Sequence, residues 1–123
     1  MPANKKILIA DDEPDFVELI SMRLEVNGYD VVSAKDGQEA IDKTKSEKPD
    51  LLILDLMMPK VDGFEVCRML KFDDNFKDLP IIVLSALDQQ QDREKAVEAG
   101  ADEYFIKPFD LSLLLTKIQE LTG

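Results

Sequence analysis

The chain has 123 residues, a length typical of a single domain. Its hydrophobic fraction of 45% excludes wholesale disorder, and 26 acidic against 15 basic residues give a net charge of −11. A surface this negative repels nucleic acid and anionic lipid, and it attracts cations and basic protein surfaces. The chain has no histidine, which excludes catalysis by histidine and zinc sites with histidine ligands.

The sequence carries no signal for secretion or for a membrane. Cys67 is the single cysteine, so no internal disulfide can form, and we expect it to be a small core residue. No apolar run approaches the roughly 20 residues that span a bilayer, and the start MPANKK lacks a signal-peptide core. We therefore expect one cytoplasmic domain over residues 1–123, with neither a membrane nor a nucleic-acid partner.

Short apolar runs, mostly β-branched, recur along the chain and predict strands. The predicted strands are Ile7–Ala10, Val31–Ala34, Leu51–Leu54, Ile81–Leu84 and Tyr104–Ile106. The first, third and fourth are continuously apolar, as is typical of strands buried on both faces of a parallel sheet.

Helical patterns separate these runs. In the first, Pro14 suits the first turn and Gly28 the stop. Asp36 and Glu39 are spaced as a capping box for the second, and a fourth helix with a thin apolar stripe is expected over Asp88–Ala99, capped by Asp88. The third and fifth helices are marked by Phe64, Cys67 and Leu70, and by Leu111, Leu114, Leu115, Ile118 and Leu121. Core positions are also expected at Phe105, Phe109 and Leu113–Leu115.

The alternation of strand and helix, repeated five times, predicts an α/β domain: a doubly wound five-stranded parallel sheet with helices on both faces. Ligands of such folds bind at the carboxyl ends of the strands. Polar groups follow four of the five predicted strands at that edge. They are Asp11, Asp12 and Glu13, then Asp55, then Ser85, and finally Lys107.

The acids at this edge point to a divalent metal. Unit charges about 4 Å apart repel by about 1 kcal/mol in water and about 4 kcal/mol at an effective dielectric of 20, so converging carboxylates need a counter-ion. Mg²⁺ suits them because it prefers oxygen ligands and keeps waters that a phosphoryl oxygen can replace. The structural alternative is that one of Asp11, Asp12 and Glu13 caps the first helix. Capping does not require three acids, nor Asp55 on another strand.

Asp55 follows a wholly apolar run, which predicts a central strand. A carboxylate there can attack a phosphoryl donor and form an acyl phosphate; the alternative is an Asp that only terminates the strand. Lys107 offers a compact positive charge for a phosphoryl oxygen or for Asp55, although most lysines are simply solvated. Ser85 offers a hydroxyl donor, although serine is also common in turns.

These residues form a recognisable pattern. The blocks ILIADDEP, LLILDLMMPKVDGFEV, PIIVLSA and GADEYFIKPF resemble, in order and spacing, the receiver domain of two-component response regulators. The resemblance extends from Ile7 to Leu121 and is closest to single-domain, chemotaxis-regulator-like receivers. It implies a flavodoxin-like sheet with strand order 2-1-3-4-5.

The resemblance also implies roles. Asp55 is the expected phosphoacceptor, supplied by a histidine kinase, a histidine phosphotransfer protein or a small phosphodonor. Mg²⁺, with Mn²⁺ as a possible substitute, is expected on Asp55, on Asp12 directly, on Asp11 through water and on the backbone carbonyl of Met57. Lys107 is expected to contact the phosphoryl group and to precede a cis peptide bond to Pro108. Ser85 and Tyr104 match the family's switch pair, whose hydroxyl moves to the phosphoryl group while the ring swings inward.

Further expectations concern the output. The fourth helix, fifth strand and fifth helix are expected to switch a downstream protein or effector, with a phosphorylation-dependent homodimer as one possible outcome. Catalysis would be limited to the domain's own phosphorylation and dephosphorylation, so the chain is not expected to be an enzyme in the usual sense. Apolar Met57 and Leu87 are compatible with slow access of the hydrolytic water.

Other functions fit less well. A flavodoxin-like cofactor module needs a phosphate loop after the first strand, where this chain has three acids. A haloacid-dehalogenase-type phosphatase needs a second acid two residues after the nucleophile, where Met57 stands. A receiver that no longer accepts phosphate would lack a site residue, and none is missing. A stand-alone protein and a domain of a longer regulator or hybrid kinase both stay open.

Overall fold

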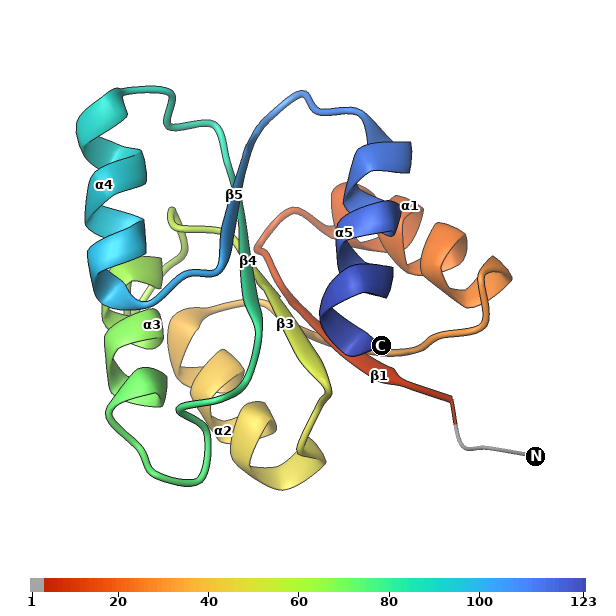
Figure 1. Ribbon diagram of the computed structural model, residues 1–123, viewed down its shortest axis with the longest axis horizontal. Helices are drawn as coiled ribbons and strands as arrows, with labels where there is room; N and C mark the ends of the chain where they lie inside the picture. Colours follow the sequence, from red (N-terminus) through yellow and green to blue (C-terminus); the bar gives the residue numbers. More distant parts are fainter. Residues whose placement is uncertain (1–3) are drawn as a thin grey trace.

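The computed structural model describes residues 4–123, so the first three residues of the predicted domain lie outside the described part. Strands and helices alternate along the chain, as the sequence predicted (Figure 1). The elements are β1 (Lys6–Ala10), α1 (Pro14–Val26), β2 (Asp30–Ala34), α2 (Gly37–Glu47), β3 (Leu51–Leu54), α3 (Gly63–Lys71), β4 (Ile81–Ser85), α4 (Gln90–Ala99), β5 (Glu103–Ile106) and α5 (Leu111–Thr122). The predicted strands are each confirmed to within one residue at either end.

The strands form one parallel sheet in the order β2-β1-β3-β4-β5, which confirms the expected fold class. The three continuously apolar strands β1, β3 and β4 occupy its centre. Ile7 pairs with Leu51 across β1 and β3, and Ile53 pairs with Ile82 across β3 and β4. A central parallel strand has a helix layer on each face, which is why both alternating sets of its side chains are apolar.

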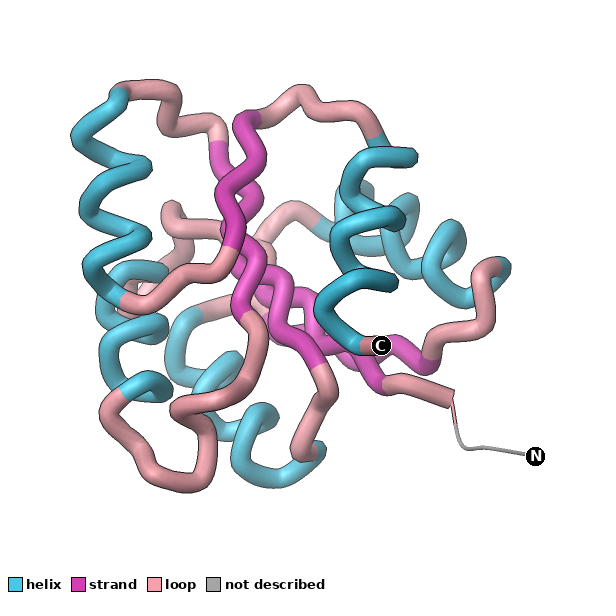
Figure 2. The backbone as a smooth tube through the Cα atoms, viewed as in Figure 1, coloured by secondary structure: helices cyan, strands magenta, loops and turns pink. Residues whose placement is uncertain are grey.

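Two helix layers sandwich the sheet, with α1 and α5 on one face and α2, α3 and α4 on the other (Figures 1 and 2). Strand β3 contributes to both cores. Leu52 and Leu54 belong to the core under α2, α3 and α4, whereas Leu51 and Ile53 belong to the core under α1 and α5. The sheet is therefore fixed from both sides, and its carboxyl edge is a rigid base for the loops that follow. Among residues 4–123 no helix is long and apolar enough to cross a membrane.

The predicted capping box at α2 is half formed. The Asp36 carboxylate accepts a hydrogen bond from the Glu39 N–H at 2.8 Å, as expected for an N-cap. The Glu39 carboxylate instead accepts from the Lys35 N–H at 2.8 Å, one residue earlier than the capping box requires. Pro14 and Gly28 are as predicted: Pro14 is the first residue of α1, and Gly28, just beyond its end, has φ +91°.

The predicted start of α4 was wrong. Asp88 does not cap this helix; Gln89 is the N-cap, and its N–H donates to the Asp92 carboxylate at 3.3 Å. Asp92 lies in the first turn, where a carboxylate can bond back to the N-cap N–H and also faces the positive end of the helix dipole. The α4 stripe is as thin as expected, since Ala96 and Ala99 are its only buried residues.

Burial was predicted for both Cys67 and Leu113, and the structure confirms it for Cys67 alone. Cys67 is fully buried, and burial raises the pKa of its thiol to about 12, so it is the expected inert core residue. Leu113 was predicted to lie in the core but is 59% exposed, whereas its neighbour Leu114 is fully buried. Phe105, Phe109 and Leu115 are partly buried against the core. A run of three leucines in a helix cannot face one side only, because successive residues are about 100° apart.

Truncating these two adjacent leucines should have different effects. We expect Leu114→Ala to lower the free energy of unfolding by about 2–5 kcal/mol, because it leaves a cavity in a packed core. Leu113→Ala should change it by less than about 0.5 kcal/mol. Urea unfolding of both variants tests this, and comparable losses would contradict the packing described above.

Candidate functional site

The functional side chains gather at the carboxyl edge of the sheet, which lies toward the top of Figure 1. Asp11 and Asp12 follow β1, Asp55 follows β3, Ser85 ends β4 and Lys107 follows β5. Hydrogen bonds continue the sheet past the strand ends: the Asp55 N–H donates to the Ala10 carbonyl at 2.9 Å. The backbone of the site is thereby an extension of the sheet, which fixes where the side chains begin.

Three carboxylates meet at this edge. Asp11, Asp12 and Asp55 each offer an oxygen, and these oxygens lie within 4.8 Å of one another. Asp11 and Asp55 are 4% and 5% exposed, and Asp12 is exposed. The cluster contains only oxygen donors, and one of its members opens to solvent. This donor set fits a hard divalent cation that keeps several of its waters.

The capping alternative was wrong: Glu13 is the N-cap of α1, and no side chain caps this helix. Asp11 Oδ1 accepts a hydrogen bond from the Glu13 N–H at 2.9 Å and so fixes the turn into α1. Its other oxygen, Oδ2, faces Lys107. The carboxylate of Glu13, 67% exposed, lies at the margin of the cluster. The turn before α1 and the charged cluster therefore use different oxygens of Asp11.

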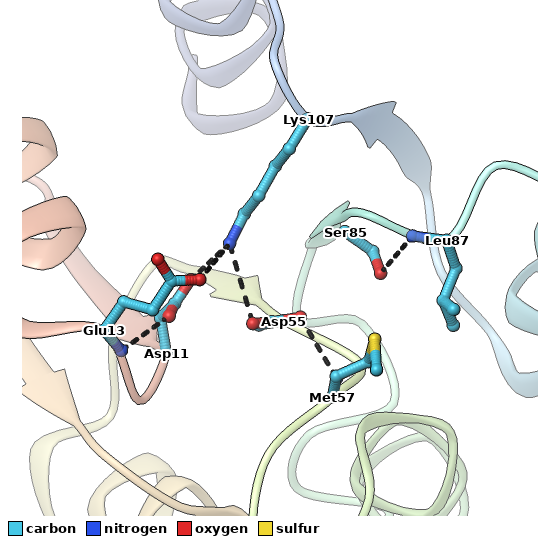
Figure 3. A network of polar contacts seen from close by, with 7 residues as sticks. All are labelled: Asp11, Glu13, Asp55, Met57, Ser85, Leu87 and Lys107. Carbon is cyan, nitrogen blue, oxygen red and sulfur yellow. Dashed lines mark hydrogen bonds and ion pairs between the residues drawn. The ribbon is translucent and has the colours of Figure 1, made fainter.

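Lys107 is the positive charge nearest these acids (Figure 3). Its Nζ lies 2.8 Å from Asp11 Oδ2, 3.6 Å from Asp55 Oδ2 and 3.8 Å from Glu13 Oε1. The Lys107 N–H donates to the Ser85 carbonyl at 2.8 Å, and the expected cis bond to Pro108 is present. Lys107 Nζ also lies 4.1 Å from the ring centre of Phe16, a contact that we did not predict because no sequence pattern places α1 against this loop.

Burial and charge act in opposite directions on the ionisable groups here. The pKa of the Asp55 carboxyl is raised, first by burial and further by the charges of Asp11 and Asp12; the Met57 N–H, 3.0 Å from Asp55 Oδ1, and Lys107 act against the rise. For the Lys107 ammonium, burial lowers the pKa, but the hydrogen bond to Asp11 and the neighbouring charges outweigh it and the pKa is raised. Burial thus works against the charged form of Asp55, and the Met57 N–H and Lys107 favour it.

Ser85 and Tyr104 are linked through the backbone of one residue, Leu87. The Leu87 N–H donates to Ser85 Oγ at 3.1 Å (Figure 3), and the Tyr104 hydroxyl donates to the Leu87 carbonyl at 2.8 Å. Tyr104 is 5% exposed, and the Arg93 guanidinium lies over its ring, 5.3 Å from the centre. The ring lies inward in this structure, and movement between two positions stays a prediction. Sequence reasoning missed Leu87 as the link because it acts through its backbone.

The Met57 side chain lies beside the acids but does not cover them. It is 58% exposed, and Leu87 across the site is half-buried. Figure 3 shows both near Asp55, on the side away from Lys107. Two apolar side chains therefore flank this side of Asp55.

Comparison with known proteins agrees with this geometry. A sequence model of the response regulator receiver domain matches residues 7–119. The chain belongs to this family. Residues 7–119 are therefore a receiver domain of two-component phosphorelay signalling.

The receiver domain is also similar to curated proteins and to solved structures. It is 49% identical over 106 residues to the alkaline phosphatase synthesis transcriptional regulatory protein PhoP of Bacillus subtilis, covering 86% of this chain but only 43% of PhoP. The chain thus spans less than half the length of that relative. The Francisella response regulator 1452 receiver domain aligns with a TM-score of 0.89 at 33% identity, covering 97% of both chains. The Thermotoga maritima response regulator TrrA, solved in complex with Mg²⁺-BeF, aligns at 0.84 and 38% identity, covering 95% of this chain and 98% of TrrA.

The raised pKa of Asp55 predicts how stability depends on pH. Burial makes the folded state bind the Asp55 proton more tightly than the unfolded chain, whose ordinary pKa is 3.8. The ionised group therefore costs stability as pH rises through the folded-state pKa, and the cost is absent below pH 3.8. We expect Asp55→Asn to raise the free energy of unfolding at pH 7 and the gain to shrink towards pH 4. Urea unfolding in EDTA measures both.

The matched control is Asp74→Asn, which changes an exposed acid in the turn after α3. Its effect should stay within about 0.5 kcal/mol at both pH values. A gain from Asp55→Asn that does not change with pH, or no gain, would contradict the account of its burial.

Proposed function

We propose that Asp55 is the phosphoacceptor of this receiver domain and that it reacts while a Mg²⁺ ion is held by the neighbouring acids. One observation carries the proposal: a buried carboxylate ends the central strand with two further acids within 4.8 Å and an ammonium 3.6 Å away. The arrangement gathers three carboxylates and one ammonium at a single edge of the sheet. It supplies a nucleophile together with groups that neutralise a phosphoryl oxygen.

The metal ligands that we propose are Asp12 directly, Asp11 through a water, Asp55 and the backbone carbonyl of Met57. The oxygen-only donor set supports Mg²⁺, with Mn²⁺ as a substitute. The exposed position of Asp12 leaves room for waters in the coordination shell. When bound, the ion supplies positive charge for the equatorial oxygens of the phosphoryl group.

Phosphoryl transfer then needs little covalent chemistry from the protein. A carboxylate oxygen of Asp55 forms a bond to phosphorus while the bond from phosphorus to the donor's histidine nitrogen breaks, and the electron pair of that bond stays on the nitrogen. The product is an acyl phosphate. Lys107 contributes by keeping a charge near the transferred oxygens, and the sheet holds Asp55 in line with the donor.

We further propose that Ser85 and Tyr104 carry the change to the α4–β5–α5 surface. The Ser85 hydroxyl accepts from the Leu87 N–H and can donate its proton to a phosphoryl oxygen, and turning Oγ towards that oxygen moves it away from the Leu87 N–H. Since the Leu87 carbonyl accepts from Tyr104, a shift of the Leu87 backbone alters the tyrosine as well. With Ala96 and Ala99 as its only buried residues, α4 is weakly anchored and can move at low cost.

The partners follow from this role. We propose a histidine kinase or histidine phosphotransfer protein as donor and a downstream protein or effector domain as target, in a cytoplasmic setting. Dimerisation on phosphorylation, a single domain over residues 1–123 and catalysis limited to Asp55 are proposed on the same basis. PhoP is named as a transcriptional regulatory protein, but the part matched here is less than half of it. The expected lack of nucleic-acid binding therefore stays a prediction about this domain.

Intact-mass measurement after incubation with Mg²⁺ and acetyl phosphate tests the acceptor. We expect one added phosphoryl group on the wild-type chain, and none in EDTA or with the D55N variant, because the first lacks the metal and the second the nucleophile. Replacing Mg²⁺ by Mn²⁺ should restore the adduct. An adduct that survives in D55N would assign the acceptor elsewhere.

The lifetime of the phosphoryl group should depend on Met57. Its exposed apolar side chain cannot hold the hydrolytic water, whereas an amide can, so we expect Met57→Asn to shorten the lifetime several-fold. The decay of the phosphorylated mass after removal of acetyl phosphate gives the rate. Met69→Asn, at an exposed methionine on α3, is the control. An unchanged lifetime in the Met57 variant would rule out this role.

A further inference from the structure

The loop that carries Met57 rests against the start of α2. This β3–α3 loop, residues 55–62, joins the phosphoacceptor to the N-cap of α3. The Gly37 N–H donates to the Pro59 carbonyl at 3.2 Å, and Lys60 Nζ lies 3.5 Å from Asp36 Oδ2. Asp36 is itself buried, 7% exposed. Two residues that the metal site does not use, Asp36 and Gly37, thus contact the loop beside it.

Position 37 requires a glycine because the backbone of α2 lies so close to the backbone of the β3–α3 loop. A Cβ built on Gly37 would lie 1.8 Å from the Val61 carbonyl oxygen and 2.6 Å from its carbonyl carbon. Both atoms belong to the backbone, so no rotation of a side chain relieves the overlap. Any other residue at position 37 must move the loop or the first turn of α2 by more than an ångström.

The loop has little freedom to retreat, because it is fixed at its other end. The Gly63 N–H donates to the Leu56 carbonyl at 3.0 Å, and a Cβ on Gly63 would lie 2.5 Å from Leu56 Cα. Asp62 caps α3 by accepting from the Glu65 N–H at 3.0 Å. Within the loop, between Leu56 and Asp62, Lys60 has φ +71°. This left-handed conformation costs energy for a residue with a side chain.

We propose that Gly37 is a positioning residue for the metal centre: its lack of a side chain lets α2 fix the β3–α3 loop and hence the Met57 carbonyl. This rests on the proposed function, in which that carbonyl binds Mg²⁺. The Met57 N–H already holds Asp55 Oδ1, so the same residue orients the nucleophile. Mg²⁺ demands near-ideal octahedral geometry at about 2.0–2.1 Å, and a loop displaced by an ångström cannot supply it.

The experiment is isothermal titration of Mg²⁺ into wild type, G37A and G28A, with urea unfolding of each. G28A is the matched control: Gly28 has φ +91° and open space around it, so a Cβ there strains the backbone without touching the site. We expect G28A to lower the unfolding midpoint and keep the wild-type Mg²⁺ affinity. G37A should lose about tenfold or more in Mg²⁺ affinity. A folded G37A that binds Mg²⁺ like wild type overturns the proposal.

A second pair of variants decides the matter if G37A does not fold. K60G removes the link to Asp36 and frees the loop, whereas K48G makes the same change at Lys48, another exposed lysine with positive φ, 48°, at the opposite end of α2. Glycine suits both backbones, so both variants should stay folded. Weaker Mg²⁺ binding in K60G alone supports the proposal, and equal binding in both overturns it. Wild type that binds no Mg²⁺ overturns the metal centre itself.

Discussion

Mutual repulsion among carboxylates is the constraint around which this molecule is arranged. Asp11, Asp12 and Asp55 bring oxygens within 4.8 Å of one another, and two of the three side chains are almost fully buried. Charges this close repel by about 1 kcal/mol in water and by more where water is excluded. A positive charge must therefore sit among them, and Lys107, 2.8 Å from Asp11, supplies part of it. Burial raises the pKa of Asp55, and the charges of Asp11 and Asp12 add to the rise, while the Met57 N–H and Lys107 oppose it.

The sheet makes this strained arrangement possible because it fixes the backbone from which the acids project. β1 and β3 are neighbours at its centre, so Asp11 and Asp55 are held side by side by the ladder itself. Cores on both faces prevent the strands from relaxing apart. The loops are different: β3–α3 is held by close backbone contacts with α2, whereas β4–α4 is held by the backbone hydrogen bonds and the partly buried side chain of Leu87. The latter loop leads into α4, whose buried residues are Ala96 and Ala99. The acids therefore lie on a well-packed base, whereas α4 buries only the small side chains of Ala96 and Ala99.

Much of this could be predicted from the sequence because it depends on local pattern. Continuous apolar runs identify strands buried on both faces, and helical stripes between them require crossovers, so the fold class and the central place of Leu51–Leu54 followed. Acids and a lysine directly after such strands must share an edge, so the residues of the candidate site could be predicted from the sequence. The errors fell where pattern is ambiguous. Asp88 and Asp92 are both suitable acids for the start of α4, and a run of leucines does not say that Leu113 is the one facing solvent.

The sequence by itself determined the order of elements, the strand-end chemistry and the charge that the site must balance, because these depend on residue type and short spacing. Only the tertiary structure decided which backbone groups connect them. Three contacts join segments that are far apart in the chain. The Leu87 backbone connects Ser85 with Tyr104, the ring of Phe16 lies against Lys107, and Gly37 approaches Val61. Such contacts depend on how the helices and loops pack against the sheet. No local sequence pattern predicts these contacts. A backbone amide, an aromatic ring or a glycine looks the same in the sequence whether or not it makes a long-range contact.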